Sequence, residues 1–80
     1  MGIKQAGVVI NVPEIINNKA IYEISIDGKR FTAESVGNQA VKDYLFIRKG
    51  QNVEIEGDIS DKHIEVQQAK IDISGMTNTQ

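Results

Sequence analysis

The sequence predicts an all-β fold, a small closed barrel of five strands with one short helix between the third and fourth strands. Apolar and polar residues alternate from Asn52 to Ile59, which is the pattern of a half-buried strand. Asp27-Gly28 is a typical two-residue hairpin turn, and a helical pattern lies between Gly37 and Gly50. Because 80 residues hold one domain, these elements share one core.

We expect residues 1–74 to form the barrel and the small, polar residues 75–80 to form a flexible C-terminal tail.

The amino-acid composition excludes several classes of function. The absence of Cys excludes disulfides and thiolate chemistry and suits a reducing compartment, so we expect a cytoplasmic protein. No long apolar run and no signal-like N-terminus is present, which predicts no membrane partner. The net charge of −2 is the opposite of what a strong phosphate binder carries.

The first strand is expected from Lys4 to Val12. Apolar residues occupy both of its sides near Val9, as they do where one barrel strand pairs with two neighbours. Pro13 ends regular pairing because it lacks a backbone donor. In the connection that follows, we expect Ile15 and Ile16 to lie across the barrel mouth and to plug the core.

A hairpin from Lys19 to Val36 forms the second and third strands. A two-residue turn at Asp27-Gly28 places Ile26 opposite Lys29 and fixes the register of the whole pair. The side expected to face the core carries Ala20, Tyr22, Ile24, Phe31 and Ala33. The outer side, where a ligand would lie, carries Ile21, Glu23, Ser25, Arg30, Thr32 and Glu34.

The helix is expected to begin at Gly37-Asn38 and to last about two turns. The stripe expected to plug the barrel consists of Ala40, Val41, Tyr44, Leu45 and Ile47. Lys42 and Asp43 are expected in water, and Phe46 lies off the stripe. The cations of Arg48-Lys49 suit the negative end of the helix dipole; a phosphate clamp is the alternative.

The fourth and fifth strands carry two irregularities. Gly57 falls on the buried side of its strand, where the missing side chain permits a sharp bend or the close approach of a neighbouring backbone. An ordinary glycine bulge in an open sheet is the alternative. In the last strand the apolar parity changes between Val66 and Ala69, which predicts a bulge near Gln67-Gln68.

This order of strands and helix is that of the OB fold, a five-stranded Greek-key barrel that binds oligonucleotides or oligosaccharides on its second and third strands and on two flanking loops. The span from Gly7 to Ile73 resembles the core of the bacterial single-stranded DNA-binding proteins. The matching positions are Ala40, Tyr44-Leu45, Lys49-Gly50, Val53, Ile55, Gly57 and Ile59. A looser resemblance is to the small OB domain of NfeD-type membrane-associated proteins; the helix and the position of Gly57 favour the first family.

The inventory of residues disfavours catalysis. His63 is the only histidine, so neither a His-assisted nucleophile nor a multi-histidine metal site can be built. Glu54, Glu56 and Asp58 share one strand face and could bind a hard cation, although such carboxylates are usually just solvated. Glycine-rich phosphate loops are absent. We therefore expect no enzyme activity, no metal and no cofactor.

Two functions remain open. The first is weak, salt-dependent binding of single-stranded DNA or RNA without strong sequence preference, as the family resemblance implies. The predicted nucleic-acid-binding residues are Lys4, Lys19, Arg30 and Lys62 for the backbone, Asn17, Asn18 and Thr32 for hydrogen bonds, and Tyr22 or Phe31, whichever is accessible, for stacking. The second is a protein-interaction barrel, in which a strand edge or the face around Ile21 docks a protein partner or a second copy of the chain.

Overall fold

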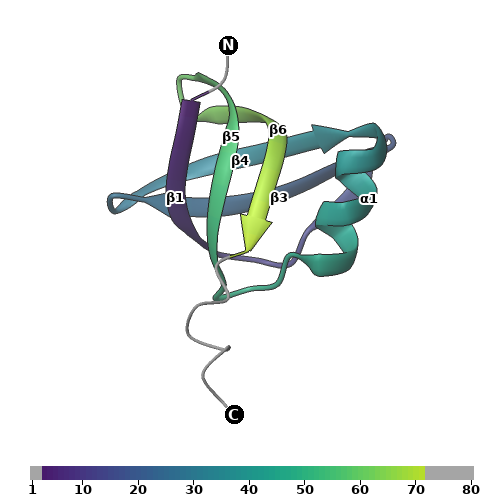
Figure 1. The fold of residues 1–80 in the computed structure, drawn as a ribbon, viewed down its shortest axis with the longest axis horizontal. Helices are drawn as coiled ribbons and strands as arrows, with labels where there is room; N and C mark the ends of the chain where they lie inside the picture. The colour runs from purple at the N-terminus through teal and green to yellow at the C-terminus, as the bar shows by residue number, and fades with distance from the viewer. Residues whose placement is uncertain (1–2, 72–80) are drawn as a thin grey trace.

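The computed structural model describes residues 3–71, which form six strands and one helix (Figure 1). The elements are β1 (Ile3–Val9), β2 (Glu14–Ile16), β3 (Lys19–Ile26), β4 (Lys29–Val36), α1 (Gly37–Phe46), β5 (Asn52–Ser60) and β6 (His63–Ile71). The predicted tail at residues 75–80 lies outside the described residues. Within residues 3–71, no helix has the length and apolar character needed to cross a membrane.

Five of the strands close into a barrel. Each neighbouring pair in the order β1, β5, β6, β4, β3 is hydrogen-bonded, and β1 also pairs with β3, which closes the ring. The β4–β6 pair is parallel and the others are antiparallel. The sixth strand, β2, pairs with β3 alone. The predicted five-stranded barrel is confirmed, with one short strand added where the sequence suggested only a loop.

The β3–β4 hairpin has the predicted register. Ile26 pairs with Lys29, Ile24 with Phe31, and so on along the two strands to Lys19 and Val36. Asp27 and Gly28 both have positive φ, 53° and 77°, as a type I′ turn requires. This turn projects at the end of the barrel opposite α1 (Figure 1).

The contact between β5 and β6 confirms both predicted irregularities. Glu56 pairs with Gln68 and Gly57 with Val66, so Gln67 is the extra residue of a bulge. A Cβ added to Gly57 would overlap the carbonyl oxygen of Glu65, so only glycine lets the two backbones come this close. The strong local bend permits β6 to pair with β5 along most of its length and with β4 near its start.

The N-terminal prediction needs correction in two places. The strand ends at Val9, which is 1% exposed and belongs to the core, whereas Val8 and Val12 are exposed. Val9 points inward because this end of β1 passes from β5 to β3, where Val9 pairs with Ile24. Ile15 and Ile16 do not plug the barrel, since both remain almost half exposed.

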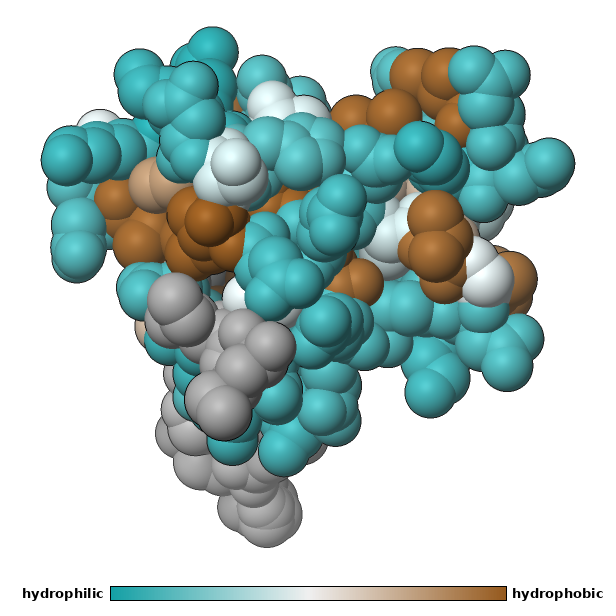
Figure 2. All heavy atoms as spheres, turned by 90° about the horizontal axis from the view of Figure 1, so that it is seen from above, coloured by the Kyte–Doolittle hydropathy of each residue, from teal (hydrophilic) through white to brown (hydrophobic). Residues whose placement is uncertain are grey.

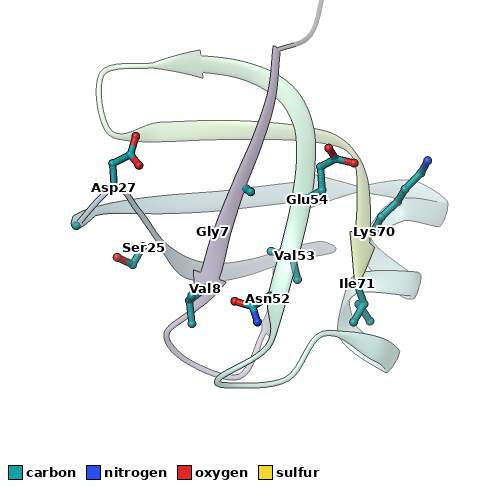
Figure 3. Close-up of a pocket in the computed structure, with 11 residues that line it drawn as sticks. Gly7, Val8, Ser25, Asp27, Asn52, Val53, Glu54, Lys70 and Ile71 are labelled. Atoms are coloured by element: carbon teal, nitrogen blue, oxygen red, sulfur yellow. The ribbon is translucent and has the colours of Figure 1, made fainter. Parts of the chain in front are cut away.

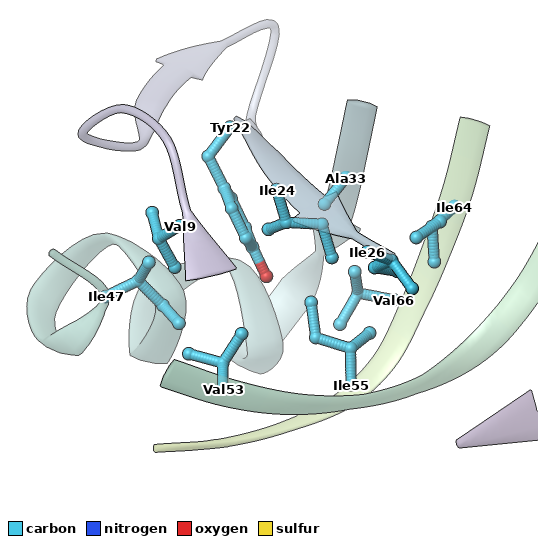
Figure 4. Close-up of a cluster of buried hydrophobic side chains, with 10 residues drawn as sticks. All are labelled: Val9, Tyr22, Ile24, Ile26, Ala33, Ile47, Val53, Ile55, Ile64 and Val66. Atoms are coloured by element: carbon cyan, nitrogen blue, oxygen red, sulfur yellow. The ribbon is translucent and has the colours of Figure 1, made fainter. Parts of the chain in front are cut away.

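The barrel interior is filled by apolar side chains from every strand of the ring and from the residue after the helix (Figure 4). The fully buried cluster consists of Val9, Tyr22, Ile24, Ile26, Ala33, Ile47, Val53, Ile55, Ile64 and Val66. Phe31 packs against this cluster but is only partly buried. Burial of these side chains supplies most of the driving force for closing the barrel.

The helix packs on β3, β4, β6 and β2, and its inward face confirms the predicted stripe only in part, at Ala40 and Ile47. Ala40, Asp43 and Ile47 point into the barrel, and of the expected stripe Val41, Tyr44 and Leu45 stay about half exposed, at 56%, 49% and 51%. Arg48 donates from Nη1 to the carbonyl oxygens of Ile47 and Tyr44, at 2.9 and 3.3 Å, which favours its predicted role at the helix end.

Asp43, which the sequence placed in water, is buried at 1% exposure. Its Oδ2 accepts hydrogen bonds from the hydroxyl of Ser35 at 2.7 Å and from that of Tyr22 at 3.2 Å, and its Oδ1 accepts from Nε2 of Gln39 at 2.7 Å. Burial raises the pKa of Asp43 in spite of these bonds, and burial beside this carboxylate raises the pKa of Tyr22. The carboxylate therefore ties the helix to β3 and β4 from within.

Candidate nucleic-acid interface

The outer side of the β3–β4 hairpin presents alternating residues to solvent, as the register predicted. We call this surface the hairpin face, and it consists of Lys19, Ile21, Glu23, Ser25, Arg30, Thr32 and Glu34. All of these side chains are exposed or partly exposed. Since the opposite sides of β3 and β4 supply part of the core, the hairpin face is carried on strands that are packed from within.

Two connecting segments border the hairpin face. On one side, Asn11 is fastened to β3: its Oδ1 accepts from the backbone N–H of Glu23 at 2.9 Å and its Nδ2 donates to Glu23 Oε1 at 3.3 Å. On the other side lies the β5–β6 turn, where the carbonyl of Lys62 accepts from the backbone N–H of Thr32 at 2.9 Å. These hydrogen bonds hold both borders in a fixed position against the hairpin.

A carboxylate at one end of the hairpin face is held between two basic groups. Glu34 lies 2.6 Å from Lys19 Nζ and 3.0 Å from His63 Nε2. The hydrogen bond and charge of Glu34 raise the pKa of Lys19, and the hydrogen bond from Lys19 is the main reason that the pKa of Glu34 is lowered. Lys19 is therefore already engaged and offers a ligand less positive charge than its exposure suggests.

Arg30 on the hairpin face and Lys62 on the bordering β5–β6 turn are not engaged in this way. Arg30 has a 67% exposed side chain, and its nearest carboxylate, Glu23, lies 4.0 Å from its Nε. Lys62 is exposed on the β5–β6 turn beside Thr32. Within residues 3–71 neither side chain is held in a short ion pair, so each is open to a phosphate.

Beside these cations the hairpin face is hollowed. A depression of about 360 Å³ lies between β3, β4 and the segment from Asn11 to Glu14. Its lining is formed by Asn11, Val12, Glu14, Ile21, Tyr22, Glu23 and Thr32. We call it the Glu14–Glu23 hollow, after the two carboxylates in its lining.

The structure places the two predicted stacking residues inside the barrel wall. Tyr22 is 1% exposed and its hydroxyl is bound to Asp43, so its ring cannot stack on a base; it is withdrawn from the candidate site. Phe31 is partly buried and packs on the core from the inward side of β4. Neither aromatic ring belongs to the outward row of the hairpin.

Three further predicted residues lie away from the hairpin face. Lys4 is on β1, paired with Glu56, and lines a groove with Glu54 and Lys70 on the β5–β6 side of the barrel. Asn17 and Asn18 form the β2–β3 turn with φ of 52° and 65°, and Asn18 borders a hollow next to α1. The structure thus brings together Lys19, Arg30, Thr32 and Lys62 and separates the others from them.

Four residues of this region were not predicted as part of the site. Asn11 and Glu14 come from the bordering segment, and His63 and Glu65 pair with Thr32 and Glu34 on the β4–β6 side. The alternation of β6, with Ile64 and Val66 inward, would have put His63 and Glu65 outward, but only the parallel β4–β6 pairing shows that they adjoin the hairpin.

A larger hollow of about 700 Å³ lies where β1 separates from the end of β3 (Figure 3). It is bordered by β1, β3, β5 and β6, and its charged residues are Asp27, Glu54 and Lys70. With two carboxylates against one cation it is less suited to phosphate than the Arg30 and Lys62 pair. Within residues 3–71, no cluster of three or more histidine or carboxylate side chains is arranged to hold a metal ion.

Comparison with known proteins identifies the fold. No family model matches the sequence, and no curated protein matches it significantly. Among solved structures, a small single-stranded DNA-binding protein from Streptomyces coelicolor aligns over 96% of both chains with a TM-score of 0.76 and 15% identity. The chain is an OB-fold barrel.

Two further structures share this OB fold. The SSB domain of a Synechococcus protein has a TM-score of 0.69 and 17% identity, over 86% of this chain and 92% of that domain. A TiaS chain, solved in complex with a tRNA, AMPCPP and agmatine, has a TM-score of 0.77 and 20% identity over 88% of this chain. The barrel spans only 18% of that TiaS chain, so it is similar to one part of a larger protein.

Proposed function

We propose that this OB-fold barrel binds single-stranded nucleic acid, weakly and without strong sequence preference, along the hairpin face. The observation that carries the proposal is the open, bordered hairpin face with Arg30 and Lys62 accessible beside the Glu14–Glu23 hollow. OB folds bind oligonucleotides on this pair of strands and the flanking loops. The similarity in shape to two single-stranded DNA-binding proteins supports the proposal.

The expected affinity is low for two physical reasons. No aromatic ring lies in the outward rows of β3 and β4, so the roughly 1 to 3 kcal/mol per base that stacking supplies is missing. Carboxylates also stand among the cations, and Lys19 is engaged by Glu34. With about two phosphates contacted, log K should fall with log salt at a slope of about −1.4.

The test is fluorescence anisotropy of a labelled 12-nucleotide strand at low and moderate salt. Arg30→Glu should weaken binding about tenfold or more, since it replaces an attraction by a repulsion at the phosphate position. Lys4→Glu is the matched control: it changes the net charge by the same amount, in the groove beside Glu54, and should weaken binding about twofold at most. Equal losses in the two variants, or no saturable binding by the wild type, would contradict the proposal.

A second candidate function is favoured by an observation elsewhere on the barrel. Ile15, Val41, Tyr44 and Leu45 are each about half exposed and surround a hollow of about 450 Å³; we call this the α1 surface. In Figure 2 apolar side chains lie at the end of the molecule where Figure 1 places α1. Such a surface suits a protein partner or a second copy of the chain. Sedimentation velocity over a range of concentrations, with Leu45→Gln as the comparison, tests self-association.

A further inference from the structure

The lining of the Glu14–Glu23 hollow carries a chemical preference. The Tyr22 hydroxyl is bonded to Asp43 in the core, and the other polar side chains of the lining are two carboxylates, one amide and one hydroxyl, from Glu14, Glu23, Asn11 and Thr32. An ionised carboxylate accepts hydrogen bonds and donates none. The hollow is therefore richer in acceptors than in donors, and a group entering it must supply N–H or O–H.

The acceptor capacity of Glu23 is only partly used. Its two side-chain contacts, from Asn11 Nδ2 at 3.3 Å and from Arg30 Nε at 4.0 Å, both reach Oε1. Within residues 3–71 no hydrogen bond reaches Oε2, and 32% of the side chain remains exposed. Glu14 is exposed on β2, so its carboxylate is also accessible from solvent. Two carboxylates thus stand ready to accept hydrogen bonds from a ligand.

Charges of both signs lie across this part of the barrel, and Glu34 on β4 is already paired with Lys19 and His63. The carboxylates of Glu14 and Glu23 stand on the β2–β3 side, whereas Arg30 and Lys62 lie on β4 and on the β5–β6 turn. A strand crossing the hairpin would keep its phosphates at the cations, because the hollow repels them. The bases would then point toward the carboxylates, with Ile21 and Val12 available for apolar contact.

We propose that the Glu14–Glu23 hollow favours one class of base, those that carry an exocyclic amino group, namely cytosine, adenine and guanine, over thymine and uracil. This inference rests on the proposed binding of single strands. A carboxylate accepts from an amino group such as cytosine N4, whereas the one N–H of the thymine or uracil ring lies between two carbonyl oxygens that a carboxylate repels. The preference arises as much from this repulsion as from the attraction.

The experiment compares labelled dC12, dA12 and dT12 by fluorescence anisotropy at pH 7.5 and low salt. We expect dC12 and dA12 to bind about five- to tenfold more tightly than dT12. Glu23→Gln and Glu14→Gln should each reduce that ratio and should together bring it to about twofold or less, because an amide can also donate to a thymine carbonyl.

Glu54→Gln is the matched control, since it removes the same charge from β5, outside the hollow. It should strengthen the binding of all three strands alike and keep their ratio. Equal affinity for dC12 and dT12 in the wild type, or a ratio unchanged in the double variant, would overturn the base preference while leaving single-strand binding in place. Failure of all three strands to bind would instead remove the proposed function itself.

Discussion

The hairpin face and the α1 surface belong to the same small barrel, yet they expose opposite kinds of side chain to solvent. The hairpin face exposes carboxylates and cations, with Glu34 held by Lys19 and His63. The α1 surface exposes Val41 and Leu45, while the helix turns a carboxylate inward. The contrast shows that strand pairing determines which side chains of the hairpin are buried. An apolar stripe on the helix does not determine its buried face in the same way.

The reason lies in what fixes each element. On the hairpin, the Asp27-Gly28 turn sets the register, and the register sets which side chains point inward. On the helix, Asp43 accepts three hydrogen bonds from groups that include the β3 and β4 side chains of Tyr22 and Ser35. These hydrogen bonds set which face of the helix lies inward, although burial disfavours the Asp43 carboxylate more than they favour it, since its pKa is raised.

The largest expected effect tests which side of the helical segment is buried. Ile47→Ala removes a side chain that is 2% exposed and lies close to Val9 and Val53 in the core (Figure 4). The lost burial and the cavity left behind should lower the free energy of unfolding by about 3 kcal/mol, measured by urea denaturation. In so small a domain this is a large part of the total stability.

Val41→Ala is the comparison for this substitution, because Val41 is also aliphatic but 56% exposed. It should change the free energy of unfolding by about 0.5 kcal/mol or less. If the two substitutions cost the same, the helix would be packed through the stripe that the sequence suggests, and the contrast between the two surfaces would fail.

Most of the fold could be predicted from the sequence because the strongest signals were local. The turn at Asp27-Gly28 and the inward position of Gly57 follow from backbone geometry that few other residues permit, and the bulge near Gln67 follows from the change in apolar parity along β6. The face of the helix could not be predicted in this way. The orientation of the helix depends on two hydroxyl groups that bond Asp43. Tyr22 carries one of them on β3 and Ser35 carries the other on β4, and neither contact can be read from the helix sequence alone.

The candidate site was predicted in part, for a related reason. Arg30 and Thr32 follow from the hairpin register alone, and Lys62 adjoins them as a turn of the predicted barrel should. Lys4 was grouped with them by its charge, although β1 carries it to the groove beside Glu54. Asn11 was missed because only its folded position, bonded to Glu23, gives it a role.

A smaller effect concerns the pH dependence of stability. Burial raises the pKa of Asp43 above 3.8, so folding favours its protonated form. The stability gained from protonation is fully present below pH 3.8 and is lost as the pH rises through the raised pKa. In Asp43→Asn this loss should be absent, because an amide can still accept from Ser35 and Tyr22 but does not titrate.

The measurement is the free energy of unfolding of both proteins from about pH 3 to pH 8, taken as a difference so that all other titrating groups cancel. The wild type should lose stability relative to the variant as the pH increases. Parallel profiles would mean that the hydrogen bonds to the Asp43 carboxylate fully offset the free energy lost by its burial.

The smallest expected effect is that of a polar substitution on the α1 surface. Leu45→Gln places an amide on the α1 surface at a position that is 51% exposed, and leucine and glutamine have similar helix propensities. The free energy of unfolding should change by about 0.5 kcal/mol or less, as measured by urea denaturation, because the amide stays in water. Were Leu45 inside the barrel, an unpaired amide there would cost about 1 to 3 kcal/mol in addition to the lost packing. A loss of that size would show that the α1 surface is core, and a value near zero leaves it free for a partner.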